Sequence, residues 1–233
     1  MSERKAPDRR IMLAGATGLV GQRVMEAAVG RPSLRLIALS RREAPMPAGA
    51  RMEMLVADTG HWGDAVATIA PDAVICALGT TWRKAGADEA AFRAVDQDLV
   101  LGLAHAAREA GAKTFVLVSS TGADPAAKTL YLRVKAEVEA QITRIGFSRL
   151  DILRPGLLRG PREGDRRVLE RLGIVLSPLT DALLQGSRRG FRSIDARTVA
   201  AAALQCAMEK ARGRFVHDND GMLRLSRRLE GAS

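Results

Sequence analysis

Short apolar runs alternate with longer amphipathic segments along the first two thirds of the chain. The apolar runs are nearly continuous, as expected of strands that are buried on both faces of a parallel sheet. They cover Arg10 to Ala14, Leu34 to Leu39, Met52 to Val56, Ala73 to Ala77, Thr114 to Val118 and Leu150 to Leu153. The strict alternation of strand and helix predicts βαβ units and an α/β fold with a Rossmann-type doubly wound parallel sheet.

The segments between these runs have the periodicity of helices. We predict helices over Gly18 to Val29, His61 to Ile69, Ala87 to Ala110 and Leu130 to Ile145. Gly30, Gly111 and Gly146 follow three of them, and glycine is common just after a helix C-terminus.

The pattern loosens after Leu153. The predicted elements there are a helix over Arg166 to Leu172, an apolar segment over Leu172 to Leu184, a helix from Asp195 to about Ala211, a strand over Phe215 to His217 and a polar, frayed tail from Ser226. We expect one domain over residues 1–233, in which residues 156–192 or so form a small C-terminal cap on the substrate side, inserted before the last helix and strand.

The composition supports a globular chain without a membrane span. Apolar residues make up 47% of the 233 positions, and no run approaches the roughly 18 apolar residues that a membrane helix requires. The charged amino terminus lacks the apolar stretch of a signal peptide, so we expect a cytoplasmic location. Cys76 and Cys206 are too few for a disulfide framework, and the three histidines lack metal-ligand spacing, so no metal site is predicted.

The formal charge of +10 invites comparison with nucleic-acid-binding proteins. The arginines, however, occur singly or in pairs with acids between them, and the chain has one tyrosine, two tryptophans and five phenylalanines for stacking bases. The sequence therefore argues against nucleic acid as the main partner.

A glycine-rich loop follows the first predicted strand directly. Its residues are Gly15, Ala16, Thr17, Gly18, Leu19, Val20 and Gly21, and the three glycines are spaced by three. Such spacing allows a tight turn and a close approach of the backbone to a pyrophosphate, while the next helix offers its positive N-terminus. The position between strand and helix predicts a dinucleotide-binding loop.

The end of the second strand bears on the choice of dinucleotide. A carboxylate there would bind the ribose 2′-hydroxyl, whereas a basic residue accommodates a 2′-phosphate. Ser40, Arg41 and Arg42 follow Leu39, so we expect NADP(H) rather than NAD(H), with Arg41 as the main phosphate ligand.

Tyr131 is the single tyrosine and stands four residues before Lys135, one of six lysines. Residues four apart on a helix share a face, so the Lys135 ammonium can lie beneath the phenol and favour its ionised form. Ser119 and Ser120 end the fifth predicted strand, where ligands bind in doubly wound sheets. The three positions predict proton transfer to or from a carbonyl or alcohol oxygen.

These motifs resemble the short-chain dehydrogenase/reductase superfamily, in its extended and atypical branches. The stretches Leu78 to Thr81, Lys84 to Ala87, Ser119 to Asp124, Leu130 to Lys135 and Arg154 to Gly156 are similar to the Tat-interacting-protein (CC3)-like oxidoreductases. The resemblance implies a Rossmann fold that binds NADPH. It further implies that Leu78, Gly79 and Thr80 line the cofactor groove, that Pro155, Gly156 and Leu157 lie near the nicotinamide, and that Asp58 lies near the adenine.

Two positions depart from the superfamily pattern. The gap from serine to tyrosine is short, which leaves open whether Ser119 or Ser120 faces the substrate, and we favour Ser120. Asp96 stands where many extended members have asparagine, so a water-relayed proton path through this position is in question.

The sequence as a whole predicts an NADPH-dependent carbonyl reductase or alcohol dehydrogenase. Tyr131 would be the acid/base, Lys135 its activator and a ligand of the cofactor ribose, and Ser120 the group that orients the carbonyl. Two alternatives use the same fold: a non-catalytic NADPH-binding regulatory or assembly protein, and a nucleotide-sugar epimerase or dehydratase. The expected partner is a small carbonyl or alcohol substrate, and both a monomer and a homodimer fit the sequence.

Overall fold

The computed structural model describes residues 9–160 and 192–231. The predicted helix over Arg166 to Leu172, the apolar segment over Leu172 to Leu184 and most of the predicted cap lie outside the described residues.

A parallel sheet of seven strands forms the centre of the fold, in the order β3-β2-β1-β4-β5-β6-β9. The strands are β1 (Arg9–Ala14), β2 (Leu34–Ser40), β3 (Glu53–Val56), β4 (Ala73–Cys76), β5 (Thr114–Val118), β6 (Arg149–Leu153) and β9 (Gly213–His217). The predicted Rossmann-type α/β sheet is confirmed. Because β1 pairs with both β2 and β4, the strand order reverses there, and the carboxyl ends of β1 and β4 mark the switch point where such sheets bind ligands.

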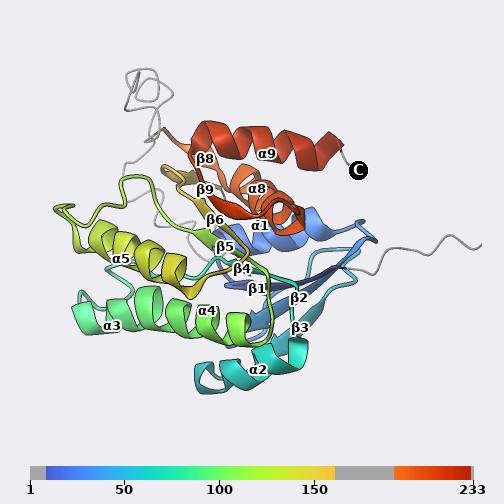
Figure 1. Cartoon of the computed structure of the whole chain (residues 1–233), viewed down its shortest axis with the longest axis horizontal. Coiled ribbons are helices and arrows are strands. Elements are labelled where there is room, and N and C mark those ends of the chain that lie inside the picture. Colours follow the sequence, from blue (N-terminus) through green and yellow to red (C-terminus); the bar gives the residue numbers. More distant parts are fainter. Residues whose placement is uncertain (1–8, 161–191, 232–233) are drawn as a thin grey trace, which may run out of the picture.

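Helices cover both faces of the sheet (Figure 1). One face carries α1 (Leu19–Ala28), α8 (Ala196–Met208) and α9 (Asn219–Gly231), and the other carries α2 (Trp62–Ile69), α3 (Glu89–Arg93), α4 (Leu99–Glu109) and α5 (Leu130–Ile145). Side chains alternate along each strand, so Ile11 and Leu13 of β1 enter one apolar core while Met12 and Ala14 enter the other. This double burial explains why the strands read as continuous apolar runs.

The prediction of one continuous helix over Ala87 to Ala110 is wrong, because the structure has a later start and a π-helical turn within this segment. Gly86 and Ala87 have φ of 71° and 56°, and the helix begins only after Asp88, whose side chain accepts a hydrogen bond from the Ala91 N–H at 2.8 Å. Between α3 and α4 lies a π-helical turn, η2 (Ala94–Asp98). Its residue Asp96 is completely buried.

The expectation of a frayed tail from Ser226 is also wrong, because the described residues up to Gly231 form α9. Met222, Leu225 and Leu229 recur at helical spacing and are buried against the core that contains α8. Arginines on the opposite side of α9 make this segment look polar in the sequence.

Short elements complete the described structure. They are the 3-10 turn η1 (Thr59–His61) and a two-stranded parallel sheet of β7 (Leu158–Arg159) and β8 (Ile194–Asp195). Asp195 caps α8 as predicted, since its side chain accepts from the Arg197 N–H at 2.8 Å.

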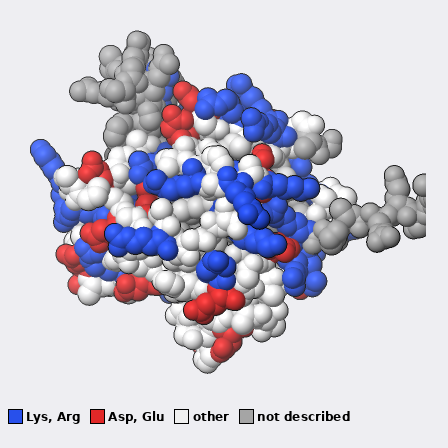
Figure 2. Space-filling view, viewed as in Figure 1, with Lys and Arg blue, Asp and Glu red and all other residues white. Residues whose placement is uncertain are grey.

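Lys and Arg side chains are spread over the face seen in Figure 2, and Asp and Glu side chains lie among them. None of the helices in the described ranges is both long and apolar enough to cross a membrane.

Candidate functional site

A cavity of about 570 Å³ opens at the carboxyl ends of β1, β4 and β5. It brings together the glycine loop, the segment after β4, the end of β5 and the first turns of α5. The residues that line it are Thr17, Gly18, Leu19, Val20, Gln22, Ala77, Leu78, Gly79, Thr80, Thr81, Trp82, Lys84, Val118, Ser119, Tyr131, Lys135 and Leu158. The topology thus gathers residues from five separate stretches of the sequence, the fifth being Leu158 of β7.

The glycine loop has the geometry that a bound pyrophosphate requires. Gly15 has φ of 93°, and a Cβ there would lie 2.5 Å from the carbonyl oxygen of Ala77. A Cβ on Gly21 would overlap the Gly15 carbonyl, so the helix can approach the strand only with glycine at this position. Gly18 is the N-cap residue of α1, and the first turn of this helix carries no acidic residue. The loop and the helix N-terminus therefore fit the anionic part of a dinucleotide.

A smaller cavity of about 110 Å³ adjoins the glycine loop at the end of β2. Ser40, Arg41 and Arg42 line it, together with Gly15, Thr17, Gly18, Leu39, Trp62, Ala77, Leu78, Gly79, Val95 and Leu99. No acidic residue is among these lining residues, and both arginine side chains are exposed. Asp58, which the family resemblance places near the adenine, lies exposed beyond β3 and does not line this cavity, where Trp62 is found instead.

Leu78, Gly79 and Thr80 follow β4 and line the larger cavity, as the resemblance implies. The Thr80 N–H donates to Asp96 Oδ2 at 2.7 Å. A Cβ on Gly79 would lie 3.4 Å from Asp96 Oδ1. The carboxylate of η2 thus sits directly behind this segment and fixes its path.

Tyr131, Lys135 and Asp96 form a connected group on one side of the cavity. Lys135 Nζ lies 2.9 Å from Asp96 Oδ1 and 5.7 Å from the centroid of the Tyr131 ring. Lys135 is buried, whereas Tyr131 is 37% exposed at the cavity. Burial is the largest single influence on the pKa of Lys135 and lowers it. The charge of Asp96, the nearby Tyr131 and the hydrogen bond to Asp96 together outweigh burial, and the net pKa lies above the usual value. Lys135 therefore remains positively charged beneath the phenol at neutral pH.

The two serines at the end of β5 have different surroundings. Ser119 lines the cavity, but its hydroxyl donates a hydrogen bond to Glu139, which also accepts from the Arg154 guanidinium. The Ser120 hydroxyl donates only to the neighbouring Thr121 carbonyl oxygen at 3.2 Å. Ser120 does not line the cavity in the described part of the chain.

Pro155, Gly156 and Leu157 do not line either of these two cavities, although Leu158 does. The Gly156 N–H donates to Asn219 Oδ1 at 3.0 Å, and the Leu157 side chain is 47% exposed. These three residues therefore directly precede, in the sequence, a residue that lines the larger cavity.

Sequence reasoning missed a second polar cluster away from the cavity. Arg149 donates to both oxygens of Asp151 at 2.6 and 2.9 Å, and His217 Nε2 lies 2.8 Å from Asp151 Oδ1. The ligand atoms of Asp151, His217 and Cys206 lie within 4.8 Å of one another, although their spacing in the sequence predicts no metal site. Arg149 already compensates the carboxylate, so we interpret the cluster as an ionic contact that joins β6, β9 and α8.

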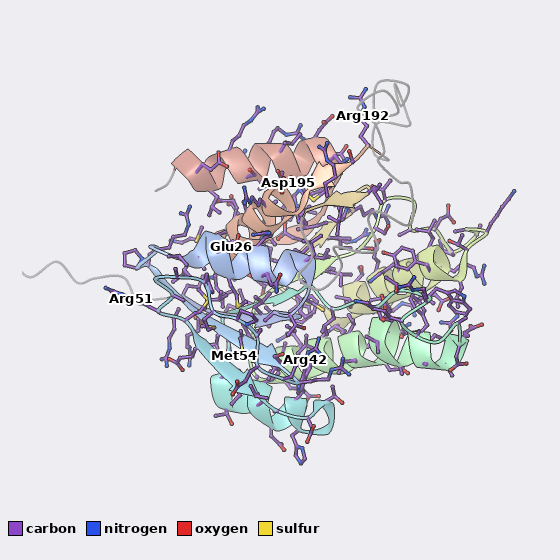
Figure 3. The ribbon with its side chains drawn as sticks, turned by 180° about the vertical axis from the view of Figure 1, so that it is seen from behind. Glu26, Arg42, Arg51, Met54, Arg192 and Asp195 are labelled. Atoms are coloured by element: carbon purple, nitrogen blue, oxygen red, sulfur yellow. The ribbon has the colours of Figure 1, made fainter. Side chains whose placement is uncertain are left out.

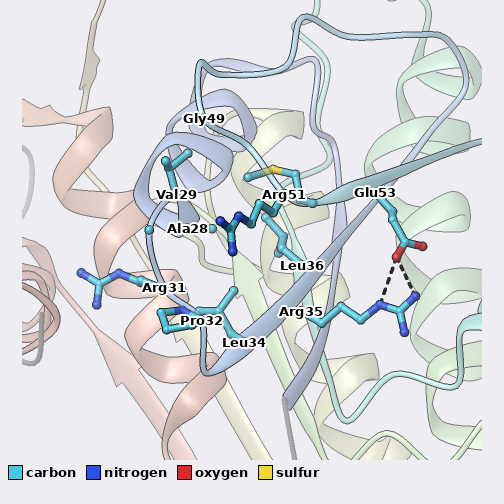
Figure 4. Close-up of a pocket in the computed structure, with 12 residues that line it drawn as sticks. Ala28, Val29, Arg31, Pro32, Leu34, Arg35, Leu36, Gly49, Arg51 and Glu53 are labelled. Carbon is cyan, nitrogen blue, oxygen red and sulfur yellow. Dashed lines mark hydrogen bonds and ion pairs between the residues drawn. The ribbon is translucent and has the colours of Figure 1, made fainter.

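A separate pocket of about 640 Å³ lies near the start of β2 (Figure 4). Its lining includes Leu34, Arg35, Arg51 and Glu53, with Arg35 paired to Glu53. Arg51 and Arg42 lie well apart in the view from behind (Figure 3). This pocket contains none of the predicted site residues.

Comparisons with known proteins identify the family of this chain. A family described as NAD(P)H-binding matches residues 15–210. Protein fmp52, mitochondrial, of Emericella nidulans is 38% identical over 191 residues, which cover 76% of this chain and 82% of the relative. MoeE5 in complex with UDP-glucose and NAD superposes with a TM-score of 0.66 at 17% identity, over 95% of this chain and 82% of that one. The UDP-glucose 4-epimerase of Thermotoga maritima with UDP-glucose has a TM-score of 0.65 at 15% identity, over the same shares of the two chains.

The solved structures share the fold of this chain, and the sequence relatives correct one expectation. The predicted cytoplasmic location is contradicted, because the fmp52 relatives are named mitochondrial. The family match across residues 15–210 supports the predicted binding of NAD(P), and the solved structures share the Rossmann-type fold. The chain therefore belongs to the family described as NAD(P)H-binding.

Proposed function

We propose that this protein is an NADPH-dependent oxidoreductase that reduces a small carbonyl compound or oxidises the corresponding alcohol. The observation that carries the proposal is the presence of Tyr131, a buried cationic Lys135 and the glycine loop around one cavity. A bound nicotinamide supplies the hydride, and the protein must supply a proton and a fixed substrate position.

Tyr131 is the residue suited to move the proton. Its hydroxyl can donate to the oxygen of a carbonyl as negative charge develops there, and the Lys135 ammonium stabilises the phenolate that remains. Asp96 holds Lys135 in place through the 2.9 Å ion pair. Lys135 would also bind a ribose hydroxyl of the cofactor.

Ser120 remains our candidate for orienting the carbonyl. Ser119 lines the cavity, but its single hydroxyl proton is engaged by Glu139. The Ser120 hydroxyl donates to the Thr121 carbonyl oxygen at 3.2 Å, and it does not line the larger cavity, so it would have to turn away from this partner to reach a substrate oxygen.

The exposed Arg41 and Arg42, with Ser40, support a preference for NADPH. A 2′-phosphate in the smaller cavity would meet two guanidinium groups and no carboxylate among the lining residues. The backbone of the glycine loop would hold the pyrophosphate for either dinucleotide.

The decisive experiment is a screen of aldehydes and ketones for NADPH oxidation by the wild type and by Tyr131→Phe. We expect the substitution to lower kcat by about 10²–10⁴-fold while the Kd for NADPH stays within twofold. Ser119→Ala and Ser120→Ala, measured beside it, identify the serine that acts on the substrate. A rate that survives Tyr131→Phe would refute the assigned role. NADPH binding without turnover across the whole screen would instead support the non-catalytic alternative.

A further inference from the structure

Lys84 gives the larger cavity a positive charge that no acidic lining residue balances. The cavity has two lysines, and Lys135 is buried and paired with Asp96. The Lys84 side chain is exposed and makes no hydrogen bond or ion pair with residues 9–160 or 192–231. Its backbone N–H donates to Thr81 Oγ1 at 3.2 Å. None of the lining residues is Asp or Glu. A cavity of this charge favours an anionic ligand.

The loop that carries Lys84 is fixed on the side of Tyr131. The Ala85 and Ala87 N–H groups donate to the Thr81 and Trp82 carbonyl oxygens, each at 2.9 Å. The ring centroids of Trp82 and Phe92 lie 6.2 Å apart. Phe92 also makes a T-shaped contact with Tyr131, with 6.1 Å between the ring centroids. Lys84 is therefore held on a loop tied to the helix region beside the proposed acid/base.

The position of Lys84 separates it from the phosphate-binding end. The two cavities share Thr17, Gly18, Ala77, Leu78 and Gly79, so they meet at the glycine loop. Arg41 and Arg42 lie on one side of this junction, and Lys84 lies with Tyr131 and Lys135 on the other. The cofactor phosphates have their own ligands at the junction and beyond it.

We propose that the substrate is an anionic carbonyl compound and that Lys84 binds its carboxylate or phosphate while Tyr131 faces the carbonyl. This inference rests on the proposed function and adds the substrate class. Trp82 adds an apolar, aromatic wall, which suits a substrate that carries an aryl or alkyl body between the two polar groups.

The test compares 4-formylbenzoate with its methyl ester, which lacks the negative charge. Calorimetric titration of the full-length protein in complex with NADP⁺ measures binding of each compound without any turnover. We expect the wild type to bind the carboxylate about 10-fold more tightly than the ester, Lys84→Met to remove this difference, and Lys84→Arg to retain it. Lys113→Met is the matched control, because Lys113 is exposed just before the start of β5, at the opposite end of that strand from Ser119.

Each remaining outcome decides the matter. Equal affinity of the wild type for the acid and the ester would overturn the inference. It would also be overturned if Lys84→Met lost as much affinity for NADPH as for the carboxylate, because Lys84 would then bind a cofactor phosphate. If the charge preference is found but neither compound is reduced by NADPH, the anion site stands and the proposed reaction fails.

Discussion

Lys135 Nζ and Asp96 Oδ1 lie 2.9 Å apart in the interior, with the Asp96 side chain completely buried. A buried charge whose partner is removed is costly, on the order of 3–5 kcal/mol. Asp96→Asn keeps an oxygen for the Thr80 N–H but removes the negative charge. We expect this variant to lose several kcal/mol of unfolding free energy in urea at pH 7.

The same substitution also affects the reaction. The Asn side chain removes the charge of Asp96 that raises the pKa of Lys135, whereas burial, which lowers this pKa, remains, so the lysine loses its proton at a lower pH. The alkaline limb of kcat against pH should move to lower pH. Asp98→Asn, an exposed neighbour on η2, is the control. Equal stability and equal pH profiles of the two variants would show that the buried pair has no such role.

Arg41→Ala tests the choice of dinucleotide. Loss of a guanidinium that binds the 2′-phosphate should weaken NADPH by about 10-fold or more and leave NADH within twofold. Fluorescence titration with both cofactors measures this directly. Arg51→Ala, in the pocket near the start of β2, is the matched control. An equal loss for NADPH and NADH would place Arg41 away from the 2′-phosphate.

Gly15→Ala tests the glycine loop. The left-handed φ of 93° costs about 1–2 kcal/mol for a residue with a side chain, and the Cβ would lie 2.5 Å from the Ala77 carbonyl oxygen. Gly30→Ala shares a positive φ of 77° but meets nothing within 4 Å. We expect Gly15→Ala to lower stability more than Gly30→Ala, and only Gly15→Ala to abolish NADPH binding. Retained binding in Gly15→Ala would argue against the loop as the pyrophosphate site.

Arg149→Met tests the ionic cluster of Arg149, Asp151 and His217, which lies away from the larger cavity. It leaves Asp151 buried without its guanidinium and should cost about 3–5 kcal/mol in urea unfolding. Arg35→Met breaks a similar pair with the exposed Glu53 and should cost no more than about 1 kcal/mol. Similar losses in both variants would mean that burial does not set the strength of these pairs.

The buried thiol of Cys76 predicts an alkaline loss of stability. Burial raises the pKa of Cys76 to about 11, so between about pH 9 and 11 the thiol ionises in the unfolded chain but not in the folded one. The unfolded state then binds fewer protons, and stability must fall as pH rises, by up to about 1.4 kcal/mol per pH unit for one group. Urea unfolding at pH 8, 9 and 10 should show a smaller slope for Cys76→Ala. An unchanged slope would assign the alkaline loss to other groups such as Lys135.

The sheet and the glycine loop were accessible from the sequence because they obey local rules. Strands buried on both faces must be apolar throughout, and the turn at Gly15 admits no side chain. Tyr131 and Lys135 could be paired for the same reason, since both lie on α5 four residues apart.

The parts that escaped prediction depend on contacts between distant segments. The residues near Ser119 in the sequence do not predict that its hydroxyl donates a hydrogen bond to Glu139. Asp151 contacts His217 only because β6 pairs with β9. Asp58 rests on the family resemblance alone and stays a prediction, whereas the position of Trp62 in the smaller cavity was not expected from the sequence. Helix α9 was missed because its apolar stripe is narrow and arginines surround it.

The π-helical turn η2 makes the helix between α3 and α4 one residue wider than a regular helix at that point. Removing a single residue there would restore regular α-helical hydrogen bonding, leave the faces of the flanking helices in place and change which side chain of the turn points inward. The apolar side chains of α4 could still cover the sheet, but the carboxylate of Asp96 would no longer lie behind Thr80 and beside Lys135. The width of this one turn is thus what allows a single carboxylate to hold both the segment after β4 and the lysine of α5.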